Sequence, residues 1–86
     1  MKTFNDLIFK QHPNWMSGTQ ARMDFPNGYG ISVITGEYAY SDNEHPYEVA
    51  VMEHGSLCYN TPITDDVIGY LDADGVTEIM KQIQEL

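Results

Sequence analysis

The segment Asp72-Ala73-Asp74-Gly75 is the clearest arrangement of residues that could bind a metal ion. Calcium loops of the EF-hand type place acidic ligands around an invariant glycine and end on a bidentate glutamate. With Gly75 at the invariant position, Tyr70 stands where the first acidic ligand should be and Lys81 stands where the glutamate should be. The segment therefore predicts no calcium site, and Asp72 fits the N-cap of a helix better.

The three histidines and the single cysteine are the other side chains that could bind a metal. Only His54 and Cys58 are close in sequence, whereas a structural zinc site needs about four ligands, usually in closely spaced pairs. The chain has no nucleophile-elbow serine, no phosphate-binding glycine loop and no paired-cysteine redox motif. We therefore expect no metal, no cofactor and no enzymatic activity. A catalytic pair among the thirteen acids is an alternative without a supporting motif.

Acidic residues are concentrated in one part of the chain. The 86 residues carry a net charge of -9. Residues 1–36 contain three bases and two acids, whereas residues 37–86 contain eleven acids and Lys81 as their only base. Such a field repels nucleic acids and anionic membranes and attracts basic surfaces. A general solubilising surface is the alternative explanation of this charge.

Tyrosines lie among these acids in the polar stretch from residue 36 to residue 46. Tyrosine is enriched in protein interfaces, and rings surrounded by carboxylates suit a groove rich in Arg and Lys. In an extended segment Asp42 and Glu44 lie on one side, about 6.6 Å apart, so they can imitate neighbouring phosphates. The residues expected to contact a partner are Tyr38, Tyr40, Asp42, Glu44, Glu48, Asp65 and Asp66.

The first half of the chain predicts a short helix followed by a β-hairpin. Thr3 is a suitable N-cap and Asp6 favours the positive end of the helix dipole, while Pro13 ends the helical pattern. Residues 20–35 alternate between apolar and polar on both sides of the Asn27-Gly28 pair, which is typical of a hairpin turn. Ile31 should face the core on this hairpin.

The second half predicts another hairpin and a C-terminal helix. A strand over residues 47–52, a turn at His54-Gly55 and a returning strand over residues 57–59 form the hairpin. The segment over residues 62–71 fits either a strand or irregular structure. The last helix follows from four apolar residues at helical spacing, namely Val76, Ile79, Met80 and Ile83.

The expected fold is one α+β domain over residues 1–86. Its small antiparallel sheet of about four strands is packed by the C-terminal helix, with the short helix at the N-terminus. No stretch is long and apolar enough to predict a membrane-spanning helix, and the first ten residues lack the apolar run of a secretory signal. A single Cys58 fits a reducing compartment, so we expect a cytoplasmic location.

Three segments, over residues 29–34, 47–51 and 61–71, resemble small uncharacterised acidic proteins of tailed bacteriophages and prophages. That resemblance implies an inhibitor of a host defence or nucleic-acid enzyme, of the anti-CRISPR or DNA-mimic kind, acting in the cytoplasm of a bacterial host. It assigns no functional residue. The hypothesis is therefore an inhibitor whose acidic, tyrosine-containing surface occupies the basic nucleic-acid-binding site of a bacterial protein. The alternative is a structural or accessory phage protein that acts by oligomerisation or docking.

Overall fold

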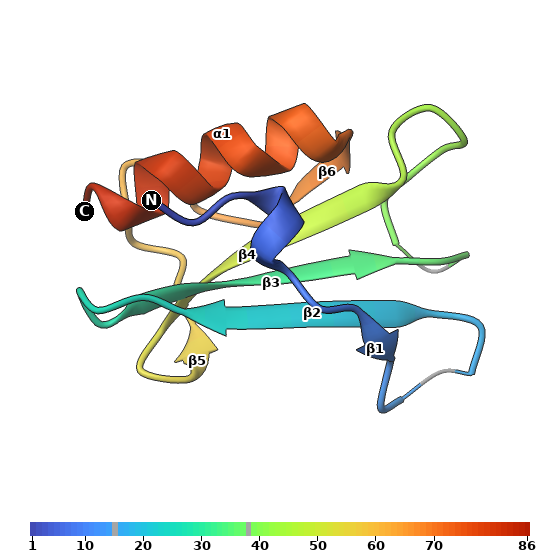
Figure 1. Cartoon of the computed structure of the whole chain (residues 1–86), viewed down its shortest axis with the longest axis horizontal. Coiled ribbons are helices and arrows are strands. Elements are labelled where there is room, and N and C mark those ends of the chain that lie inside the picture. Colours follow the sequence, from blue (N-terminus) through green and yellow to red (C-terminus); the bar gives the residue numbers. More distant parts are fainter. Residues whose placement is uncertain (15, 38) are drawn as a thin grey trace.

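The computed structural model describes residues 1–14, 16–37 and 39–86, in which an antiparallel sheet carries one helix on one face (Figure 1). The α+β class is confirmed. In chain order the elements are η1 (Phe4–Asp6), β1 (Lys10–Gln11), β2 (Thr19–Asp24), β3 (Tyr29–Thr35), β4 (Tyr47–Glu53), β5 (Ser56–Leu57), β6 (Ile68–Leu71) and α1 (Ala73–Gln84). Within the described residues, no helix has the length and apolar character that crossing a membrane requires.

In the described residues the sheet has six strands, somewhat more than the four expected. The order is β1-β2-β3-β4, and the far edge of β4 is shared by β5, which pairs with its end, and β6, which pairs with its beginning. The additional strands are β1 and β6. β1 has two residues and β6 has four with an irregular register, so neither is long enough to show the alternation that identifies a strand in a sequence.

The predicted N-terminal helix is a single 3-10 turn, η1. Thr3 and Asp6 do define its start, because the Thr3 amide donates to the Asp6 carboxylate at 2.8 Å. Leu7 is already extended, and the chain continues to β1. An isolated helix of one or two turns is marginal in water, and here the strand and the docking of the Phe4 and Phe9 rings against Tyr47 stabilise the extended path instead.

Two hairpin turns lie where the sequence places them. In the first, the Gly28 amide donates to the Phe25 carbonyl at 3.1 Å, and Gly28 has φ of 88° while Asn27 keeps a negative φ. The turn is therefore the kind in which a glycine in the left-handed region follows a right-handed turn. In the second, both His54 and Gly55 have positive φ, as a tight two-residue hairpin turn requires.

The core lies between the sheet and α1 (Figure 1). Val33 has Ala21 and Val49 as its cross-strand neighbours, and Ile31 has Met23 and Val51, so these side chains share one face. Against this face α1 buries Val76, Met80 and Ile83, whereas the fourth predicted residue, Ile79, is only partly buried. Asp72 is the N-cap, as predicted, and its carboxylate accepts from the Gly75 amide at 2.7 Å.

Side-chain amides fix the end of α1. The Asn27 side chain donates to the Ile83 carbonyl at 2.9 Å, which satisfies a carbonyl in the last turn of the helix. Gln84 accepts from the Lys2 amide at 2.9 Å and donates to the Lys2 carbonyl at 2.8 Å. The first hairpin and the N-terminus are thereby both joined to the C-terminal end of the helix.

Candidate macromolecular interface

The polar loop between β3 and β4 contains a turn organised by Asp42. One oxygen of its carboxylate accepts from the amides of His45 at 2.7 Å and Glu44 at 3.0 Å, and it lies 3.1 Å from Nδ1 of the His45 ring. The His45 amide is the main cause of a lowered pKa for Asp42, to which the His45 ring and the Glu44 amide contribute. Asp42 is thus held ionised in a fixed position, although its side chain is exposed.

Glu48, in β4, also makes a hydrogen bond to this loop. It is paired with Ile34 in the β3–β4 register, so it lies on the sheet face opposite to Val49, which is the face that α1 leaves uncovered. One of its carboxylate oxygens accepts from the Tyr40 amide at 3.0 Å. Asp42 and Glu48, which were expected to contact a partner, therefore also position the loop that contains Tyr40, another expected contact residue.

Tyr40 is joined to β6. Its carbonyl accepts from the Tyr70 amide at 2.7 Å, and a Cβ on Gly69 would lie 2.5 Å from the Tyr40 Cβ. That approach is closer than any real side chain permits, so position 69 requires glycine. The loop therefore packs against β6 at this point, through one backbone hydrogen bond.

β6 contains a bulge next to this contact. Ile68 pairs with Val49 and Leu71 with Tyr47, so Gly69 and Tyr70 are both opposite Glu48. Tyr70 takes the extra rotation with φ of 56°, in the left-handed region that a residue with a ring rarely adopts. Both tyrosines are exposed residues, with 61% of Tyr40 and 56% of Tyr70 accessible to solvent. We call Tyr40 and Tyr70, together with Glu48, which accepts from the Tyr40 amide and lies opposite Tyr70, the tyrosine patch.

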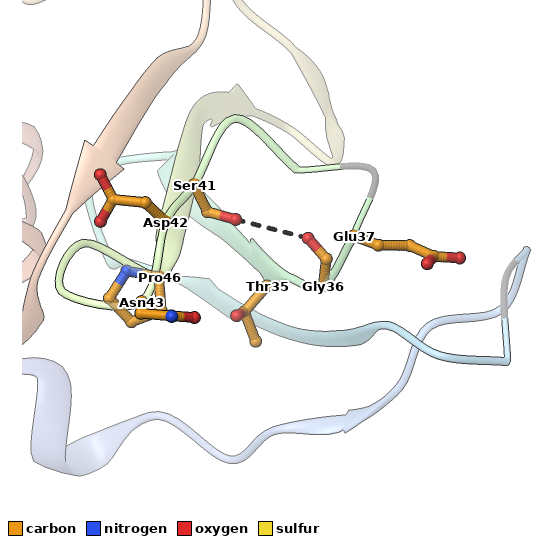
Figure 2. A pocket seen from close by; sticks show the side chains of 7 residues that line it. All are labelled: Thr35, Gly36, Glu37, Ser41, Asp42, Asn43 and Pro46. Carbon is orange, nitrogen blue, oxygen red and sulfur yellow. Dashed lines mark hydrogen bonds between the residues drawn. The ribbon is translucent and has the colours of Figure 1, made fainter.

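A shallow hollow of about 410 Å³ adjoins the turn, between the start of the loop and Pro46 (Figure 2). The Ser41 hydroxyl spans part of it by donating to the Gly36 carbonyl at 3.4 Å. The carboxyl groups of Glu37 and Asp42 point in opposite directions at its two sides (Figure 2). Among the described residues, no three His, Cys, Asp or Glu side chains are grouped as a metal site would require.

The expected contact residues are brought together only in part. Tyr40, Asp42, Glu44 and Glu48 belong to one loop and the strand after it, and Tyr38 lies outside the described residues. Asp65 and Asp66 lie in the segment that precedes β6, where Asp66 accepts from the Val67 amide at 2.7 Å. No hydrogen bond or ion pair connects either of them to the described part of the loop.

Sequence reasoning missed Tyr70 as a candidate contact residue. Its segment was ambiguous between strand and irregular structure, and nothing in the sequence marks a tyrosine that adopts a positive φ. The only signal was Gly69 before it, since glycine inside a strand pattern often marks a bulge or a close approach of two backbones.

Comparison with known proteins finds no matching family model, no matching curated protein and no matching solved structure. The geometry of the tyrosine patch and the distribution of charge are therefore the basis for a functional proposal.

Proposed function

We propose that this protein is a binding protein whose tyrosine patch and adjacent acidic turn, over residues 42–45, occupy a basic surface of another macromolecule. The observation that carries the proposal is Tyr70, a non-glycine residue that adopts the left-handed region and is more than half exposed. Strained backbone of this kind costs of order 1–3 kcal/mol and is concentrated at functional sites. Because the Tyr70 ring is not needed to fill the core, a binding role accounts for a strained tyrosine at this position.

The chemistry of the patch suits arginine and lysine side chains. Tyrosine faces attract cations. Two carboxylates are near Tyr40, because Glu48 accepts from its amide and Asp42 follows it by two residues. Glu44 is exposed in the same turn, and its side chain makes no hydrogen bond or ion pair with a described residue. It is therefore free to pair with a cation of the partner.

Rings and charges have different tasks in this proposal. An exposed ion pair contributes only about 0–1 kcal/mol, so the acids mainly accelerate encounter with a basic partner. Burial of two tyrosine rings supplies affinity, since tyrosine is among the residues that dominate binding energies in interfaces. Loss of the rings should therefore weaken binding more than loss of a single acid.

The specific form of the proposal is inhibition of a bacterial nucleic-acid-binding protein, by occupation of the site that binds phosphates. The excess of acids over bases in residues 37–86 supports this form, because such a surface competes with nucleic acid for the same cations. The resemblance to small acidic phage proteins supports a phage origin and an anti-CRISPR or related role.

The test is a capture experiment from bacterial lysate that has been treated with nuclease, so that nucleic acid cannot bridge bait and prey. Immobilised protein should retain nucleic-acid-binding proteins and release them as salt is raised. The variant Tyr40→Ser/Tyr70→Ser should lose them. Tyr59→Ser is the matched control, because Tyr59 is also exposed and lies outside the patch. Equal capture by all three baits would contradict the proposal.

A further inference from the structure

A second hollow, of about 340 Å³, lies at the other edge of the sheet and is lined by Ile8, Lys10, Gln11, Gln20 and Arg22. We call it the basic notch. Lys10 is paired with Gln20 in the β1–β2 register, and Arg22 is two residues further along β2. Because alternate residues of a strand share a face, Lys10, Gln20 and Arg22 all lie on the sheet face that α1 leaves uncovered.

The two cations of the notch have no counter-ion in the described part of the chain. The only ion pairs there are His45 with Asp42 and Lys81 with Glu78. Arg22 uses one guanidinium nitrogen to donate to the Gly55 carbonyl at 3.2 Å, which leaves further donors available. Half of the four Lys and Arg residues of a chain with thirteen acids are thus unneutralised in one hollow.

The fold keeps these cations away from the acids. The cross-strand row Lys10, Gln20, Ile34, Glu48 takes one residue from each of four neighbouring strands. Strands are about 4.8 Å apart, so Lys10 lies about 14 Å from Glu48 across the sheet, well beyond ion-pair contact. The acidic turn from Asp42 to His45 leads into β4, on Glu48's side of this row. The acids of the loop between β3 and β4 therefore lie toward the opposite edge of the sheet from the notch and can reach its cations only in another molecule. Asp24, two residues after Arg22 on β2, shares the face of the notch but forms no ion pair with Arg22.

We propose that the basic notch of one copy binds the acidic turn of a second copy, so that the protein associates with itself head to tail. Glu44 is the group that enters the notch, since its carboxylate is exposed and has no partner among the described residues. The donors that line the notch are Lys10, Arg22, Gln11 and Gln20, of which Gln20 also donates to the Ser32 hydroxyl at 3.1 Å. A single contact of this kind leaves one notch and one turn open, so it produces rings or chains, whereas two copies that exchange both contacts form a two-fold dimer.

Net charge sets the conditions under which this contact forms. Two copies repel each other through their charges of -9 over the whole molecule, which extends 24–32 Å, whereas the notch and the turn attract at contact distance. The Debye length is about 30 Å at 0.01 M salt, about 10 Å at 0.1 M and about 3 Å at 1 M. Long-range repulsion is therefore screened at intermediate salt while the contact survives. Association should therefore be strongest at about 0.1 M salt and weaker at both lower and higher salt.

The experiment is sedimentation of the full chain from micromolar to millimolar concentration at the three salt concentrations. The wild-type average mass should rise with concentration, most at the intermediate salt. Lys10→Gln/Arg22→Gln should remain monomeric. Lys2→Gln/Lys81→Gln removes the same charge elsewhere, so it should still associate, weakened at most by the repulsion that its additional net negative charge causes. Lys10→Gln alone covers the case in which loss of the Arg22 contact with Gly55 impairs folding.

A mixing experiment identifies the two surfaces. Lys10→Gln/Arg22→Gln removes the charges of the notch but keeps the turn, and Glu44→Lys reverses the exposed charge of the turn but keeps the notch and Asp42. Each variant alone should be monomeric, and an equimolar mixture should give a one-to-one complex that cannot grow. A wild type that stays monomeric under all conditions, or a notch variant that associates like the wild type, overturns the inference.

This contact uses the acidic turn of the proposed function but does not depend on a foreign partner. The notch variants retain the tyrosine patch, so they should still capture a basic partner. Their behaviour therefore separates a failure of self-association from a failure of the proposed function.

Discussion

Tyr70 adopts a conformation that its sequence neighbours do not require. In the left-handed region the Cβ of an ordinary residue approaches the following carbonyl, at a cost of about 1–2 kcal/mol. The bulge opposite Glu48 and the bond from the Tyr70 amide to the Tyr40 carbonyl compensate for this cost. Glycine would adopt the same φ without strain, so the ring rather than the backbone explains a tyrosine at this position.

Replacing Tyr70 by glycine and by alanine separates the ring from the strain. Both variants lose the ring, but only Tyr70→Gly relieves the backbone, so it should unfold at higher temperature than Tyr70→Ala. The expected difference is about 1 kcal/mol, or about 4–8 °C in Tm for a domain of this size. Thermal melts measure it. Equal Tm values would show that φ at residue 70 carries no strain, and the main support for a functional Tyr70 would be lost.

Asp42 stabilises the turn that contains it, although its side chain is exposed. Its carboxylate accepts from two amides and faces the ring of His45, and these contacts favour the ionised form. Because the pKa of Asp42 is lowered in the folded protein, its contribution to stability is present above the unfolded value of about 3.9 and disappears as pH falls through the lower folded value.

The corresponding prediction compares Asp42→Ala with Glu44→Ala. At neutral pH Asp42→Ala should melt at lower temperature than the wild type, whereas Glu44→Ala should not, since the Glu44 side chain makes no hydrogen bond or ion pair with a described residue. The deficit of Asp42→Ala should shrink as pH falls below about 3.9, where the wild type loses the same carboxylate. A deficit that is independent of pH would mean that the turn is stabilised by something other than the charged carboxylate.

At the scale of elements, the sequence predicted those with long periodic patterns. The C-terminal helix follows from its apolar spacing and the Asp72 cap, and β2 and β3 follow from alternation around Asn27-Gly28. β1 escaped prediction, and β6 was left open between strand and irregular structure, because tertiary pairing, not local pattern, forms such short strands. The N-terminal helix was too long in prediction because capping signals mark a start but do not fix a length.

The candidate site was predictable by composition but not by geometry. Acids and tyrosines of the β3–β4 loop stand out in the sequence, and Tyr40 and Glu48 are indeed joined in the fold. The inclusion of Tyr70 depends on where β6 lies against β4. A pairing between segments about twenty residues apart has no local signature, so residue types alone could not supply it.

The packing of α1 leads to a graded prediction for its apolar residues. Ile83 is completely buried in the core, so Ile83→Ala should lower the free energy of unfolding by about 2–5 kcal/mol, a large part of the stability of a small domain. Ile79 packs at the border of the core and is only partly buried, so Ile79→Ala should cost distinctly less. Urea denaturation of both variants gives the comparison. A larger cost at residue 79 would mean that the helix is rotated relative to the sheet.

At the scale of the whole molecule, charge is separated more than folding requires. The core between the sheet and α1 is apolar, and within the described residues every buried side-chain nitrogen or oxygen has a hydrogen-bond partner. The acids therefore do little for the interior and repel one another at the surface. Salt should stabilise the folded state by screening that repulsion, while it weakens contact with a basic partner.

Neutralising acids at two places distinguishes a functional surface from a solubilising one. Glu44→Gln/Asp65→Asn removes two exposed acids from the expected contact set, and Glu78→Gln/Glu85→Gln removes two exposed acids from α1 and its C-cap. Both variants reduce the net negative charge equally, so both should keep or slightly raise the Tm by relieving repulsion. Only the first should slow association with a basic partner and flatten the dependence of its on-rate on salt, because charges near a contact steer encounter. Binding kinetics against a captured partner at low and intermediate salt measure this difference. If both variants slow association to the same extent, net charge alone attracts the partner, and the acidic turn has no special place in recognition.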